Sequence, residues 1–68
     1  METTILTIET VNQTGIYYFD LNTNSNRIKV SWHEKQLRVF NNLSEAFVWF
    51  INNHSDYSVK NIDENYVK

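Results

Sequence analysis

An apolar segment, Ile16-Tyr17-Tyr18-Phe19-Asp20-Leu21, decides the fold expected for this chain of 68 residues. Successive side chains of a strand point to opposite faces of a sheet. Ile16 and Tyr18 therefore share one face, and Tyr17, Phe19 and Leu21 share the other. The rest of the chain predicts one clear helix, which can cover only one face. We therefore expect something else to cover the second face.

Three other segments have the residue types and alternation of strands, at residues 4–11, 27–32 and 37–40. Short polar stretches separate them: residues 12–15, which contain the only glycine, residues 22–26, and residues 33–36. Connections of this length favour pairing of sequential strands in an antiparallel meander.

The apolar period changes to that of a helix at residues 44–54. Ser44 is a suitable N-cap, and Glu45 in the first turn suits the helix dipole. We predict an α+β fold: a three- or four-stranded antiparallel β-meander with one C-terminal α-helix packed across one face. Residues 1–54 form this single domain, and residues 55–68 form a polar tail or a short extra element.

The predicted core takes one face of each strand and one stripe of the helix. It comprises Leu6, Ile8, Ile16, Tyr18, Ile28, Val30, Trp32, Leu37, Val39, Leu43, Phe47, Phe50 and Ile51. The register of the first strand stays open, because Ile5 and Val11 are also apolar and a slip of one residue exchanges the faces.

Composition argues against several function classes. The chain has no cysteine, and its formal net charge of −2 disfavours general adhesion to nucleic acid. No apolar run approaches the ~20 residues of a membrane span, and the N-terminus has no signal-peptide pattern, so we expect a cytoplasmic protein.

No pattern of catalytic, cofactor-binding or metal-ligating residues stands out. His33 and His54 are far apart in the chain, and a histidine at a helix end is explained by capping and the dipole. So small a fold also leaves little room for a pocket of ~300 Å³. We therefore expect a protein that is not an enzyme and binds neither cofactor nor metal.

The uncovered face is the main candidate site. It is expected to combine Tyr17, Phe19 and Leu21 with Phe40 and the basic residues Arg27, Lys29 and Arg38. These basic residues could form the rim of a protein or homodimer interface. Alternatively, bases of a single-stranded nucleic acid could stack on the rings while phosphates contact the cations. Cover by the C-terminal residues is the third possibility.

Trp49 lies on the side of the expected helix away from Phe47, Phe50 and Ile51. An exposed tryptophan is a good interface anchor, since a rigid ring contributes a large area at low entropic cost. The competing interpretation places it under the C-terminal residues, against Tyr57 or Ile62.

The leading hypothesis is a non-enzymatic protein-binding module that self-associates and acts by occluding or organising a protein partner. Its size and composition suit a regulator or inhibitor encoded by a phage or mobile element. One alternative is a single-stranded nucleic-acid binder, and another is a structural subunit of a larger assembly. No membrane or metal partner is expected.

Overall fold

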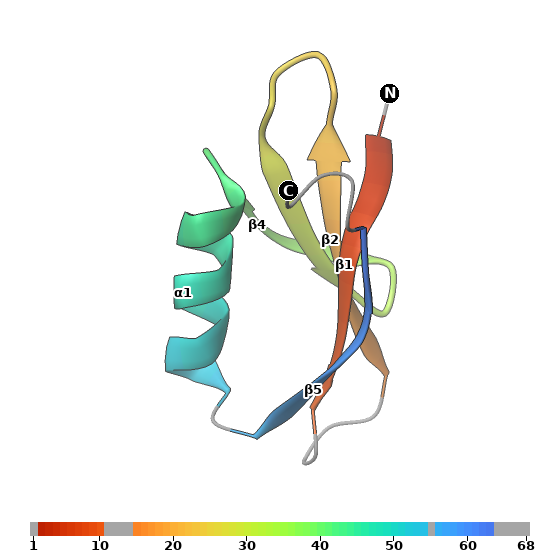
Figure 1. The fold of residues 1–68 in the computed structure, drawn as a ribbon, viewed down its shortest axis with the longest axis vertical. Coiled ribbons are helices and arrows are strands. Elements are labelled where there is room, and N and C mark those ends of the chain that lie inside the picture. The colour runs from red at the N-terminus through yellow and green to blue at the C-terminus, as the bar shows by residue number, and fades with distance from the viewer. Residues whose placement is uncertain (1, 11–14, 55, 64–68) are drawn as a thin grey trace.

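Five strands form one antiparallel sheet, and a single helix lies over one of its faces in the computed structural model (Figure 1). The structure describes residues 2–10, 15–54 and 56–63. In chain order the elements are β1 (Glu2–Thr10), β2 (Ile16–Asn22), β3 (Ile28–Trp32), β4 (Lys35–Phe40), α1 (Leu43–Asn53) and β5 (Tyr57–Ile62). Val11, residues 12–14 of the first predicted turn and the end of the predicted tail, residues 64–68, lie outside the described residues.

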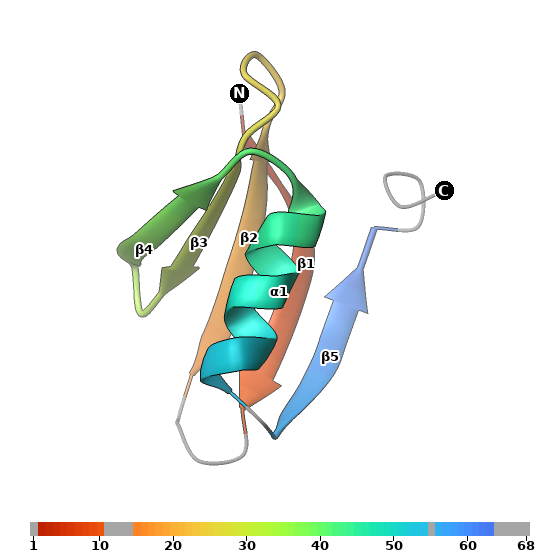
Figure 2. The same cartoon turned by 90° about the vertical axis from the view of Figure 1, so that its left-hand side faces the viewer.

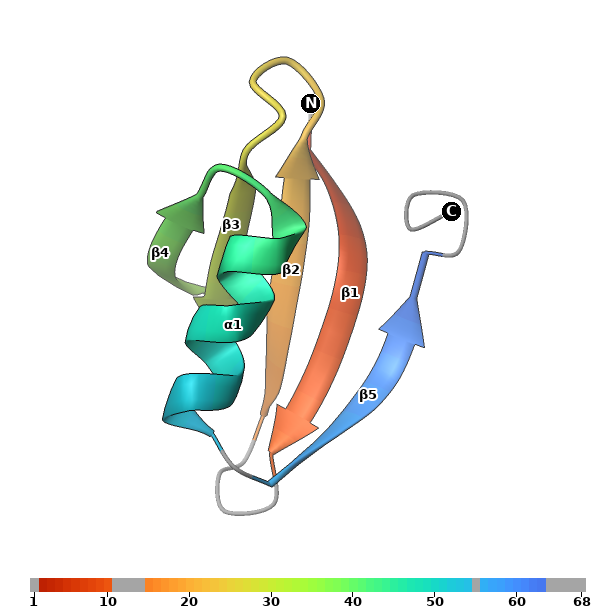
Figure 3. The ribbon, with the colours of Figure 1, turned by 60° about the vertical axis from the view of Figure 1, so that its left-hand side comes forward.

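The sheet order is β4-β3-β2-β1-β5, and all pairs are antiparallel. Strands β1 to β4 follow one another as the predicted meander. The chain then passes through α1 to the opposite edge of the sheet, where β5 pairs with β1 (Figures 2 and 3). The α+β class is confirmed, but the sheet has five strands rather than three or four, because residues 57–62, in the segment predicted to be a tail or a short extra element, form β5.

The helix begins earlier than predicted. Its N-cap is Asn42 rather than Ser44, and the Asn42 side chain accepts a hydrogen bond of 2.8 Å from the backbone N–H of Glu45. The Asn42 amide also donates to the Glu45 carboxylate at 3.2 Å. Asparagine caps as well as serine does, so the two candidates could not be separated by residue type.

The helix covers the face of β2 that we expected to be open. Tyr17, Phe19 and Leu21 lie opposite Trp32, Val30 and Ile28 of β3, and Tyr17 and Phe19 are buried. The Phe50 ring of α1 contacts the rings of both Tyr17 and Phe19, at centroid distances of 5.1 and 5.7 Å.

The predicted inward positions Ile16 and Tyr18 lie on the other face of the sheet, and 41% of Tyr18 is exposed. Asp20 shares that face, and burying its carboxylate without a partner would be costly. This carboxylate explains why the Tyr17 face, and not the Tyr18 face, receives the helix.

The observed core overlaps the predicted core only in part. Leu6, Ile8, Ile28, Val30 and Phe50 are buried as predicted, and Trp32, Leu43 and Phe47 are partly buried. Tyr18, Leu37, Val39 and Ile51 are exposed instead, and Ile16 is half-buried. The buried residues Ile5, Tyr17, Phe19 and Ala46 were not in the predicted core.

Two shifts in register account for several of these differences. Between β1 and β2, Thr4 pairs with Asp20 and Leu6 with Phe19, so Ile5 is an extra residue and both Ile5 and Leu6 are buried. Between β3 and β4 the shift leaves Leu37 unpaired. A bulge of this kind breaks strict alternation, which is the pattern from which the core was predicted.

The turn between β3 and β4 has only two residues, and both have positive φ: 52° at His33 and 63° at Glu34. Two central residues with positive φ are typical of a tight hairpin turn that matches the twist of the strands. Gly15 also has a positive φ of 99°, and a Cβ there would lie 2.7 Å from the His33 ring. The only glycine is thus required by both backbone conformation and close approach.

Candidate functional site

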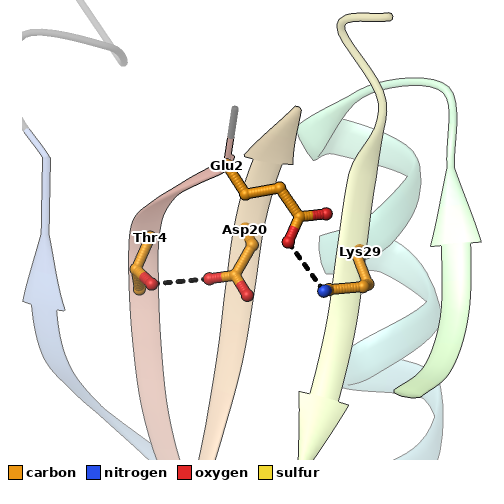
Figure 4. Close-up of polar contacts among 4 residues, drawn as sticks. All are labelled: Glu2, Thr4, Asp20 and Lys29. Atoms are coloured by element: carbon orange, nitrogen blue, oxygen red, sulfur yellow. Dashed lines mark hydrogen bonds and ion pairs between the residues drawn. The ribbon is translucent and has the colours of Figure 1, made fainter. Parts of the chain in front are cut away.

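On the sheet face away from α1, polar and charged side chains of β1, β2 and β3 lie beside Ile16 and Tyr18, and Figure 4 shows four of the polar ones. The Thr4 hydroxyl donates to the Asp20 carboxylate at 2.6 Å, and the Lys29 ammonium lies 2.7 Å from the Glu2 carboxylate. The hydrogen bond to Glu2 raises the pKa of Lys29, while partial desolvation of the ammonium opposes that shift. Each of the three charged groups Glu2, Asp20 and Lys29 therefore has a polar partner within the molecule.

The predicted aromatic and basic face does not assemble. One sheet face does contain the predicted aromatic and apolar residues Tyr17, Phe19, Leu21 and Phe40, but α1 covers much of it. Lys29 lies on the opposite face, beside Glu2. Arg27 is exposed and lies just before β3. Of the three predicted basic contacts, only Arg38 lies beside one of the predicted aromatics, with its guanidinium 5.7 Å from the centre of the Phe40 ring. The premise that an apolar sheet face stays open is therefore wrong.

A single helix is too narrow for this sheet. Strands lie about 4.8 Å apart, so five of them span roughly 19 Å between the outermost axes. A helix with its side chains is about 10–12 Å wide. Figure 2 shows α1 over the middle strands, with β4 and β5 extending beyond it on either side. A groove therefore lies along each side of the helix.

The groove between α1 and β5, here called the β5 groove, has a volume of about 300 Å³. It is lined by Leu6, Leu43, Ser44, Phe47, Val59 and Ile62, and none of these side chains is charged. Val59 and Ile62 remain 48% and 41% exposed. The groove is therefore an uncharged apolar surface in contact with water.

The groove between α1 and β4, here called the β4 groove, is larger, at about 640 Å³, and chemically mixed. Its lining includes Arg38 and Phe40 of β4, Glu45 and Trp49 of α1, and the amides Asn41 and Asn52. Phe40 and Trp49 pack against each other with ring centroids 5.5 Å apart. These two volumes also correct the expectation that the fold has no room for a pocket.

Trp49 matches neither of the positions considered from the sequence. It is half-buried rather than fully exposed, and within the described residues its ring packs against Phe40 of β4 and not against Tyr57 of β5. Tyr57 of β5 instead contacts Phe47 and Phe50, with centroids 5.8 Å apart in each case. Trp49 and Phe40, both predicted interface residues, are thus brought together in the β4 groove.

His54 lies at the C-terminal end of α1, beside two aromatic rings. Its backbone N–H donates to the Phe50 carbonyl, and its ring lies 4.9 Å from the Tyr17 ring and 4.7 Å from the Phe50 ring. Burial raises the pKa of the Tyr17 phenol. Among the described residues, no three histidine or acidic side chains lie close enough together to hold a metal ion.

The sequence left open whether residues 55–68 form a tail or a short extra element, and it did not indicate the apolar side of β5 as a candidate site. Tyr57, Val59 and Ile62 looked like scattered apolar residues, yet they face the same side of the sheet as Leu6 and Ile8. The spacing of Tyr57 and Val59 was a signal for a strand. The spacing of three residues from Val59 to Ile62 does not fit the alternation of a strand, because the register shift between β1 and β5 adds one residue.

In the part of the chain that the structure describes, no helix has both the length and the apolar character needed for a membrane span. Compared with family models, with curated protein sequences and with solved structures, the chain matches none of them significantly.

Proposed function

We propose that this protein is a small protein-binding module that self-associates through the β5 groove and acts by occluding or organising a protein partner. The observation that carries the proposal is the uncharged apolar lining of that groove, formed by Phe47 of α1 and by Val59 and Ile62 of β5. A small protein that leaves such a surface in water loses part of the free energy that burial would contribute.

A second copy suits this groove because a two-fold interface places each surface against itself. Such an interface brings like charges together, so an uncharged surface is favoured. The β5 side also has both shapes that a self-complementary contact needs. The groove beside Phe47 is concave, whereas the exposed side chains of Val59, Ile62 and Ile51 can enter the groove of the partner copy.

Pairing of sheet edges is a less favourable route to the dimer. In β5 the register shift leaves Lys60 with no paired residue in the strand register with β1, although its ammonium lies 3.6 Å from the Glu9 carboxylate; in β4 the corresponding unpaired residue is Leu37. Bulges and edge lysines are devices that prevent one sheet from adding to another. Side-chain packing in the β5 groove therefore supports self-association better than backbone hydrogen bonding does.

Sedimentation equilibrium of the purified chain tests this proposal. We expect a monomer–dimer equilibrium that Val59→Asp shifts to monomer, because a carboxylate would have to be buried in the apolar contact. Leu37→Asp is the matched control, since Leu37 is a similarly exposed apolar residue on the opposite edge strand. Circular dichroism checks that both variants keep their fold.

The salt dependence adds a second criterion. Association by apolar contact should stay the same or strengthen as sodium sulfate is added. A strict monomer at the highest attainable concentration would overturn the proposal. So would a folded Val59→Asp variant that dimerises as well as the parent chain.

A further inference from the structure

The β4 groove differs from the β5 groove in charge and in aromatic content. The outer edge of the groove is β4, and the hairpin to which β4 belongs, residues 27–40, contains four of the six basic residues of the chain and a single acidic residue. Lys29 is paired with Glu2 on the far face of the sheet. Within the described residues, Arg27, Lys35 and Arg38 form no ion pair. This edge of the molecule is therefore cationic, although the whole chain is slightly acidic.

The lining of the groove combines an aromatic surface with polar groups. The tilted rings of Phe40 and Trp49 lie side by side, and the Arg38 guanidinium lies over the Phe40 ring. The side-chain amides of Asn41 and Asn52, also in the lining, can both donate to and accept from a peptide backbone. Half-buried aromatic rings beside an arginine have the composition of interface residues that dominate binding energy.

Glu45 is the one carboxylate in the lining, and its charge is offset in two ways. The Asn42 amide donates to it at 3.2 Å, and it lies in the first turn of α1, where the helix dipole favours a negative group. It therefore weakens the attraction of the groove for an anion without cancelling the field of the β3–β4 hairpin.

We propose that the β4 groove binds an extended acidic segment of a partner protein in which an aromatic side chain is flanked by carboxylates. The aromatic ring packs against Phe40 and Trp49, and a carboxylate forms a charge-assisted hydrogen bond with Arg38. Lys35 and Arg27 attract the remaining negative charge. This inference deepens the proposed function by naming the chemistry of the partner, on a surface separate from the dimer contact.

An acidic peptide explains the groove better than nucleic acid does. Bases would need several exposed rings along a continuous basic path, whereas only one aromatic pair lies here. The side-chain amides of Asn41 and Asn52 in the lining can form hydrogen bonds with the backbone of an extended peptide.

Fluorescence anisotropy with a fluorescein-labelled peptide, Gly-Ser-Asp-Glu-Phe-Asp-Glu-Gly, tests the inference on the full chain. We expect saturable binding that weakens as sodium chloride is added. Replacing the acidic residues of the peptide by lysine should abolish binding, and replacing its phenylalanine by alanine should weaken it. Failure of the acidic peptide to bind, or equal binding of the lysine peptide, would overturn the proposal.

Two substitutions with opposite expected effects on peptide affinity test whether the peptide binds in the β4 groove. Arg38→Glu should weaken peptide binding about tenfold or more, the loss expected for one charge-assisted hydrogen bond. Glu45→Gln should strengthen it, because it removes the one carboxylate of the lining and keeps an acceptor for Asn42. Lys60→Glu on β5 is the matched control and should change affinity by about twofold at most, as exposed and distant charges do. A folded Arg38→Glu variant that binds like the parent chain would contradict the assignment.

Competition with a labelled single-stranded oligonucleotide completes the test. If the oligonucleotide binds in an Arg38-dependent manner and displaces the peptide, the groove is a nucleic-acid site and the inference is wrong. The dimer proposal is judged separately, since Val59→Asp should abolish self-association and leave peptide affinity unchanged.

Discussion

The two grooves beside α1 have the same origin but different chemistry. Both exist because one helix covers the middle of a five-stranded sheet and leaves its two edges uncovered. The β5 groove is small, apolar and uncharged, whereas the β4 groove is larger and carries Arg38, Glu45 and an aromatic pair. A cover narrower than the sheet therefore leaves two chemically different grooves on one sheet face.

Charge decides which of the two surfaces suits a second copy. Like charges meet across a two-fold axis, so the cationic hairpin at β4 disfavours self-association and favours an acidic partner. The uncharged lining at β5 has no such penalty. The proposed division of roles, self-association at β5 and partner binding at β4, follows from this difference.

The largest expected effect comes from removing the support that the two grooves share. Phe50→Ala deletes the ring that packs on Tyr17 and Phe19 beneath α1, and should cost about 3–5 kcal/mol of unfolding free energy. For a domain of this size that is most of the total stability. We expect urea denaturation to show a largely unfolded chain that has lost both binding activities.

Val48→Ala is the control for this substitution, since Val48 lies on the same helix and is 53% exposed. It should leave the free energy of unfolding nearly unchanged. A Phe50→Ala variant as stable as the Val48→Ala control would mean that α1 does not hold the sheet together as described.

Gly15→Ala should destabilise the β4 side by about 1–3 kcal/mol, because the residue has positive φ and the new Cβ would meet the His33 ring at 2.7 Å. Hydrogen exchange should show the loss first in the β3–β4 hairpin. Combining it with His33→Gly, which removes the ring, should recover part of the loss in a double-mutant cycle. If the effects of the two substitutions on the free energy of unfolding simply add, the close approach is not responsible.

Glu34→Gly should stabilise the chain by about 1 kcal/mol, because φ at Glu34 is 63° and glycine adopts this conformation without the Cβ penalty. It also removes the only carboxylate of the hairpin, so acidic-peptide binding at the β4 groove should strengthen. Glu34→Gln separates the two effects, since it removes the charge and keeps the strained backbone. Thermal unfolding and peptide anisotropy measure them, and equal stability of the two variants would contradict the backbone argument.

Lys29→Met gives the smallest effect and should leave both grooves unchanged. An exposed ion pair such as Lys29–Glu2 stabilises by about 0.5 kcal/mol. The pKa of Lys29 is raised above 10.5 in the folded state, so this stabilisation is complete below that pH. It is lost as the pH rises through the raised pKa. Urea denaturation should therefore distinguish the variant from the parent chain at pH 7 and not at strongly alkaline pH. A constant difference across this range would show that the methionine acts through packing instead.

Much of the fold could be read from local pattern. The alternation of Ile28, Val30 and Trp32 gave the inward face of β3 correctly, and the helical stripe through Phe47 and Phe50 gave the covering element. The antiparallel meander followed from the short connections. Of the candidate site, the sequence indicated Phe40 and Arg38 on the sheet face and Trp49 as a separate contact on the helix, and the structure brings these three together in one groove.

Two features depend on packing between distant segments: which face of β2 the helix covers, and which strands extend beyond the helix. Tyr17 and Phe19 on one face and Ile16 and Tyr18 on the other are both apolar enough to be buried, so periodicity could not choose between them. The choice depends on the cross-strand position of Asp20 beside Thr4 and Lys29, and on two register shifts that no local pattern reveals. The grooves follow from the width of a helix relative to five strands, a property that exists only once β5 has joined the sheet.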